Sequence, residues 1–174
     1  MGKVINFPEQ RAPEQRNRRV WGRIETDDPP RDAYDFARLL TVAERMLASR
    51  EKRFPVMVRE GKLEAAEAER ELVTFRAIVA DWRWLESGEG QPAPIGSLPC
   101  RRAALDRSIG TIAEIARDEG CFSDELAAQA DAVIAMRWHL EPGSRTHALA
   151  HVTHEIRREI TAGAAAPKEA AHAE

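Results

Sequence analysis

Apolar residues recur at helical spacing over almost the whole chain from Asp32 onward, and this period constrains the fold more than any other feature of the sequence. In the first such segment the apolar side chains fall within one arc of a helix. They are Phe36, Leu39, Leu40, Ala43, Met46, Leu47, Phe54 and Val58. The alternating pattern of a half-buried strand is not found. The sequence therefore predicts an all-α protein, a bundle of about five helices.

Turn-forming residues divide the chain into segments. Pro55 is expected to kink or break the first helix near Arg53, and Gly61 is expected to end it. A second helix begins near Leu63, and because the turn is short the two helices should form a long antiparallel hairpin. The predicted segments are a basic flexible arm (1–31), the helical hairpin (32–86), a Gly- and Pro-rich loop (87–99), a three-helix segment that packs on the hairpin (100–161) and a disordered, Ala-rich tail (162–174).

Positive charge is concentrated at the start of the chain. Residues 1–24 carry six Lys or Arg and two Glu, a net charge of +4, whereas the whole chain has a net charge of −3. In the helix that follows, four cations recur every seven residues, away from the apolar arc. Such a row fits either a nucleic-acid backbone or an ordinary solvated face. A nucleic-acid-binding accessory protein would use Arg16, Arg18, Arg19, Arg23, Arg38, Arg45, Lys52 and Arg59.

The second helix of the hairpin is apolar on two sides. One side runs from Phe75 to Trp82, and the opposite side has a second apolar strip of Val73, Ala77, Ala80 and Trp84. A helix with two apolar sides is either buried on both or presents one of them to a partner. The strip is therefore either the centre of a single core, covered by the later helices, or a surface for a protein partner or for self-association, with Trp84 as its anchor.

Three histidines share one face of the last predicted helix, at positions 147, 151 and 154. Two imidazoles four residues apart can bind one divalent ion, but Ala148 stands where a His-Glu-x-x-His motif has its glutamate. This face lies opposite Leu149, Val152, Ile156 and Ile160, which are expected to point into the core. The histidines are therefore predicted to face solvent, and no metal site is predicted.

Sequence signals of catalysis are missing. The chain has no Gly-rich phosphate loop, no serine nucleophile elbow and no Cys-x-x-Cys pair. No apolar run reaches the ~18 residues of a membrane span, and no secretory signal follows Met1. These observations predict a cytoplasmic protein that is not an enzyme, has no cofactor and does not contact a membrane.

One stretch carries a family resemblance. Basic residues precede Phe54-Pro55, and Val58, Gly61-Lys62-Leu63, Ala68, Phe75 and Ile78 follow. With these residues the segment Ser49–Ile78 resembles a helical hairpin of uncharacterised bacteriophage and prophage proteins. The resemblance implies a mobile-element origin and a hairpin fold, and it carries no activity.

These features together predict a non-catalytic, phage-type protein that acts by binding a macromolecule, mainly another protein. A specific form of this hypothesis is an inhibitor of a host defence complex, such as an anti-CRISPR protein, whose acidic faces compete for a nucleic-acid channel. The alternative is the nucleic-acid-binding accessory protein described above.

Overall fold

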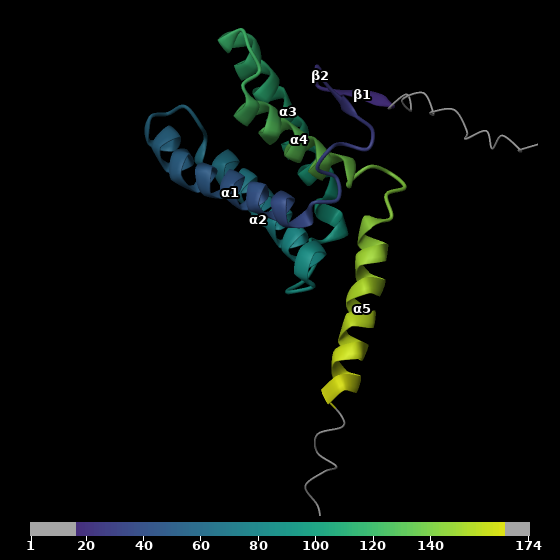
Figure 1. Cartoon of the computed structure of the whole chain (residues 1–174). Helices are drawn as coiled ribbons and strands as arrows, with labels where there is room; N and C mark the ends of the chain where they lie inside the picture. Colours follow the sequence, from purple (N-terminus) through teal and green to yellow (C-terminus); the bar gives the residue numbers. More distant parts are fainter. Residues whose placement is uncertain (1–16, 166–174) are drawn as a thin grey trace, which may run out of the picture.

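The computed structural model describes residues 17–165 and confirms the predicted all-α bundle, to which it adds one small hairpin of strands (Figure 1). The helices pack around one apolar core, and no helix in this part of the chain is long and apolar enough to cross a membrane. The elements are β1 (Arg18–Trp21), β2 (Ile24–Asp27), α1 (Phe36–Arg59), α2 (Ala65–Ser87), the short 3-10 helix η1 (Ile95–Ser97), α3 (Leu98–Glu119), α4 (Asp124–Trp138) and α5 (Thr146–Ala165).

Helices α1 and α2 form the predicted long hairpin. Asp35 caps α1, since its Oδ1 accepts a hydrogen bond from the Arg38 N–H at 3.0 Å. The predicted break near Arg53 is not found: α1 continues through Pro55 to Arg59, because proline removes only one backbone donor so close to the helix end. Gly61, in the left-handed conformation at φ 68°, then reverses the chain.

Helices α3 and α4 cover the hairpin and complete one core. The largest fully buried side chains come from all four helices, so the two halves of the sequence share a single interior. These side chains include Leu39, Phe75, Ile78, Trp82, Leu105, Ile109, Val133, Ile134 and Met136. In these helices the apolar period of the sequence correctly indicates the buried face.

The predicted flexible arm is wrong for its C-terminal part. Residues 18–27 form an antiparallel pair of strands, whose turn at Gly22 and Arg23 has positive φ at both positions, the geometry that joins two strands tightly. Trp21 anchors the pair: its side chain is buried, with the Arg19 and Arg137 guanidinium groups over its ring. Residues 1–16 of the predicted arm, Arg16 among them, lie outside the described residues.

Helix α5 is packed differently from the others. It projects from the body, the name used below for the β1–β2 hairpin together with α1–α4, and it contacts the body far less closely than those helices contact one another (Figure 1). The prediction for its faces is wrong, because Leu149, Val152, Ile156 and Ile160 are exposed. The helix also continues to Ala165, beyond the predicted start of the tail at 162, and residues 166–174 lie outside the described part of the chain.

Candidate functional site

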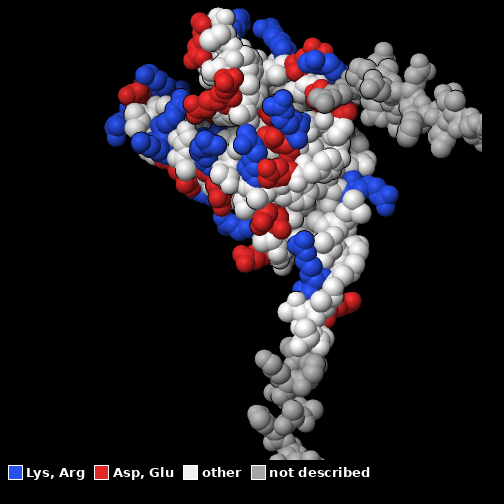
Figure 2. Space-filling model, in the orientation of Figure 1, with Lys and Arg blue, Asp and Glu red and all other residues white. Residues whose placement is uncertain are grey.

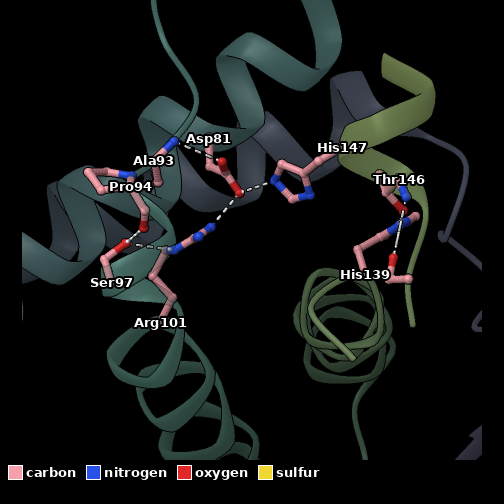
Figure 3. Close-up of polar contacts among 9 residues, drawn as sticks. Asp81, Ala93, Pro94, Ser97, Arg101, His139, Thr146 and His147 are labelled. Carbon is pink, nitrogen blue, oxygen red and sulfur yellow. Dashed lines mark hydrogen bonds and ion pairs between the residues drawn. The ribbon is translucent and has the colours of Figure 1, made fainter. Parts of the chain in front are cut away.

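A buried carboxylate holds the first turn of α5 against the body. Asp81 of α2 is 1% exposed, and its Oδ2 lies 2.5 Å from Arg101 Nη1 and 2.9 Å from His147 Nε2 (Figure 3). Its Oδ1 accepts a hydrogen bond from the Ala93 N–H at 2.9 Å. Both oxygens are therefore engaged by donors from α3, from α5 and from the loop after α2.

The Arg101 side chain extends this network into the loop. Its Nε donates to Ser97 Oγ at 3.1 Å, and the Ser97 hydroxyl donates to the Pro94 carbonyl at 2.6 Å. Breaking a buried pair by removing one partner is strongly destabilising, because it leaves an uncompensated charge. This arrangement ties the loop and α5 to the body, and Asp81 itself is shielded from solvent.

His139, just after α4, provides a second anchor for the same turn. It is packed among Phe36, Trp82 and Trp138, and burial lowers its pKa, an effect that its hydrogen bond to Ala33 opposes. Because a carbonyl only accepts, the neutral ring carries its proton on Nε2, 2.5 Å from the Ala33 oxygen.

The other ring nitrogen of His139 then accepts a hydrogen bond. Nδ1 lies 2.6 Å from Thr146 Oγ1 (Figure 3), so the Thr146 hydroxyl donates to it. Ser144 Oγ, 3.0 Å from Thr146 Oγ1, donates in turn to Thr146. Thr146 is the first residue of α5. The neutral form of His139 is therefore coupled to the position of this helix.

The histidine face of α5 lies on Trp84, contrary to the prediction that it faces solvent. The His147, His151 and His154 rings lie 6.2, 6.2 and 5.2 Å from the Trp84 ring, centre to centre. His154 is buried and rests against Gly88, where an added Cβ would come within 2.9 Å of its Nδ1. His151 keeps an exposed side chain. In residues 17–165 no group of three or more potential metal ligands comes together.

The opposite side of α5 is an apolar stripe, defined here as Leu149, Val152, Ile156 and Ile160. These side chains are 50–66% exposed. At 3.6 residues per turn they fall within an arc of about 80°. Figure 2 shows charged atoms spread over the body, while most of α5 is white on the face in view. The helix thus turns its polar face inward and its apolar face outward.

Charged side chains border this stripe unequally. Arg157 lies on one flank, and Glu155 and Glu159 lie on the other, by their positions around the helix. Glu155 is 4.0 Å from His151 Nδ1. The stripe therefore has a positive and a negative border.

The apolar strip predicted as a partner surface is split by the fold. Val73 is exposed, and Ala77 and Ala80 are half-buried. Trp84 is 9% exposed because α5 covers it. The four residues therefore do not form one open surface, and the position predicted for the anchor of a partner is occupied by the histidines of this chain.

The predicted basic residues also differ from one another, because only some of them form ion pairs within the described part of the chain. Arg38 is bound to Asp32 at 2.7 Å, Arg18 pairs with Glu25, and Arg19 pairs with Glu141. Three cations of the row on α1 are exposed and have no ion pair among the described residues: Arg45, Lys52 and Arg59. The α1 glutamates that directly precede Arg45 and Lys52 pair with α2 instead, where Glu44 binds Arg83 and Glu51 binds Arg76.

Comparison of the chain with protein-family models, with curated proteins and with solved structures finds no match in any of the three. The resemblance of residues 49–78 to phage hairpin proteins stays a prediction. Sequence reasoning identified the residues of α5 but assigned their faces the wrong way round. The contact that it missed, between the three histidines and the ring of Trp84, has no signal in the helical period of the sequence.

Proposed function

We propose that this chain is a non-catalytic protein that acts by binding another protein through the apolar stripe of α5. One observation carries the proposal: four large apolar side chains stand in a row on a projecting helix, each at least half exposed. Contiguous apolar patches on soluble proteins mark interaction sites, and an amphipathic helix that presents spaced anchors is a common recognition element. The non-catalytic part rests on the sequence, which has no Gly-rich phosphate loop, no serine nucleophile elbow and no Cys-x-x-Cys pair.

The borders of the stripe favour a second copy of this chain as the occupant, with the two α5 helices parallel. In a parallel pair the opposite borders meet, so Arg157 of one copy faces the Glu155 and Glu159 side of the other. An antiparallel pair would place like charges together. The histidine face, which contacts the body, lies on the far side of each helix, so the two bodies lie on the outside of the pair and do not obstruct it.

The test is the mass of the full chain in solution, measured by sedimentation over a range of concentrations. We expect a reversible dimer whose dissociation constant rises at least about tenfold in Ile156→Asn, because each copy loses a buried apolar side chain. Ile115→Asn is the matched control, since Ile115 is also partly exposed but lies on α3. A wild-type chain that stays monomeric at all concentrations, or equal effects of the two variants, contradicts the self-pairing.

Charge exchange tests the orientation. R157E places glutamates on both borders and should weaken a parallel dimer, and the triple variant R157E/E155R/E159R should restore it. In an antiparallel dimer the single R157E change only replaces one like-charge contact by another. Failure of the triple variant to restore the dimer would contradict the parallel arrangement.

Binding of nucleic acid is a second candidate, and it is favoured by the three α1 cations that have no ion pair within residues 17–165. Arg45, Lys52 and Arg59 are exposed at seven-residue spacing, which corresponds to about 10 Å along the helix. We expect any binding to weaken steeply between low and physiological salt, since it would depend on phosphate contacts. A gel shift with mixed DNA and RNA at two salt concentrations tests this, and no shift at low salt eliminates it.

A further inference from the structure

The space between α5 and the body is a cavity of about 1060 Å³. It is bounded by the C-terminal end of α2, the loop that follows, the start of α3 and the inward face of α5. Sites for small organic molecules have volumes of roughly 300–1000 Å³ and combine apolar walls with a few placed polar groups. The cavity is therefore large enough for a ligand of that kind.

One wall of this cavity changes from apolar to cationic along its length. Ile95, Leu98 and Arg102 all line it and follow one another at spacings of three and four residues through η1 and α3. Such spacings place side chains on one helix face, and seven residues of helix rise by about 10 Å. Ile95 is 87% exposed, the highest value among the exposed large apolar side chains of the described part of the chain. Trp84 provides aromatic surface in the same cavity.

Arg102 is a half-buried cation without a carboxylate partner among residues 17–165. Its Nε donates to the Leu140 carbonyl at 2.5 Å, and no described group binds its other two nitrogens. Glu141 is the one carboxylate among the described residues that line the cavity, and both it and the buried Asp81 are already paired with other arginines. Asp81 binds Arg101, and Glu141 accepts hydrogen bonds from Arg19 and Arg137.

The α5 side of the cavity adds two polar side chains, Arg158 and His154, that have free hydrogen-bonding atoms among the described residues. Arg158 lines it without an ion pair to any described residue, and its Nε is 3.4 Å from the His154 carbonyl. His154 itself is 7% exposed, and its Nε2 has no hydrogen-bond partner among the residues that the structure describes. A cavity with unpaired cations and one apolar wall is complementary to a molecule with an anionic head and an apolar body.

We propose that this cavity binds an anionic amphiphile, a small molecule with an alkyl chain and a carboxylate head. The head is bound by the free guanidinium nitrogens of Arg102, and the chain lies over Leu98 and Ile95 toward Trp84. This site is distinct from the apolar stripe, which faces the other way, and the inference does not depend on self-pairing of α5.

The test titrates the full chain with decanoate, decyl phosphate and decanol, below the concentrations at which they form micelles, and measures heat and tryptophan fluorescence. We expect decanoate to bind more tightly than decanol. Arg102→Gln should weaken decanoate binding about tenfold or more and leave decanol binding unchanged, because only the charged head uses Arg102. Ile95→Asn should weaken the binding of both. If decyl phosphate binds in preference to decanoate, the carboxylate head is wrong.

Arg45→Gln is the matched control, because Arg45 is also a cation without an ion pair among the described residues but lies on α1, outside the cavity. Thermal unfolding of each variant checks that the fold is retained. No decanoate binding, or equal losses in Arg102→Gln and Arg45→Gln, overturns the proposal. Loss of binding in Ile156→Asn but not in Arg102→Gln would place the probe on the apolar stripe and also overturn it.

Discussion

The body and α5 are both amphipathic helical structures, but they use their two faces in opposite ways. In α1–α4 the apolar face is buried and the charged face is in solvent, so these helices satisfy the hydrophobic effect within the chain. In α5 the polar face meets the body, where His147 binds Asp81 of α2 and His154 is buried, and the apolar stripe is in water. The difference shows that α1–α4 cover their apolar faces with one another, whereas the described part of the chain leaves the apolar stripe of α5 uncovered.

The largest expected effect tests the polar anchor of α5. Asp81→Ala would leave the Arg101 guanidinium buried without its counter-charge, which typically costs about 3–5 kcal/mol of unfolding free energy. Urea denaturation measures this loss. Asp118→Ala is the control, because Asp118 pairs with Arg117 on the exposed surface, where such a pair contributes about 1 kcal/mol or less. Equal losses in the two variants would mean that the buried pair does not hold the structure together.

A second pair of substitutions tests the contrast between core and projecting helix directly. Ile109→Ala should lower the unfolding free energy by about 2–5 kcal/mol, since Ile109 is 1% exposed. Ile160→Ala removes the same atoms from the stripe, and at dilution, where the chain is monomeric, it should change the value by no more than about 0.5 kcal/mol. If Ile160→Ala costs as much as Ile109→Ala in the monomer, α5 lies on the body with its apolar face inward.

This contrast also explains what the sequence could predict. The apolar period located all five helices, and in α1–α4 it indicated the buried face correctly, because those helices bury their apolar sides against one another. For α5 the same rule gave the wrong face. The rule assumes that the apolar side is covered within the chain, and no period in the sequence shows that Asp81 and Trp84 bind the histidines instead.

The strand pair at 18–27 was missed for a different reason. Its strands have four residues each, too few to show an alternating pattern against a background of charge. The positive φ values at Gly22 and Arg23 and the burial of Trp21 depend on the body against which the pair packs. Basic composition alone therefore gave a flexible arm where the chain is ordered.

A third prediction concerns pH, because the neutral form of His139 is coupled to the first turn of α5. Burial lowers its pKa in the folded state, so the unfolded chain binds a proton first as the pH falls below about 6.5. The stability that His139 contributes is complete above that pH and is lost toward the lower folded pKa, with a slope of at most about 1.4 kcal/mol per pH unit.

Unfolding free energies of the wild type and His139→Gln between pH 8 and 5 measure this contribution as a difference, since glutamine retains a donor for the Ala33 carbonyl. We expect the variant to have the flatter profile. Every other ionisable group is the same in both proteins, so the difference between the two profiles belongs to His139. Parallel profiles would show that His139 does not sense pH.

The smallest expected effect tests the contact between His154 of α5 and Gly88 at the end of α2. Gly88 and Gly61 follow α2 and α1 with similar φ values of 78° and 68°, so alanine at either position costs about 1–2 kcal/mol for the left-handed backbone. At Gly88 the added Cβ also meets His154, whereas at Gly61 it meets nothing within 4 Å. Gly88→Ala should therefore differ little from Gly61→Ala in global stability, yet it should raise hydrogen exchange throughout α5, because a weakly held element opens locally. If exchange in α5 is equal in the two variants, His154 does not hold the helix, and Asp81 and His139 hold it without help from the Trp84 contact.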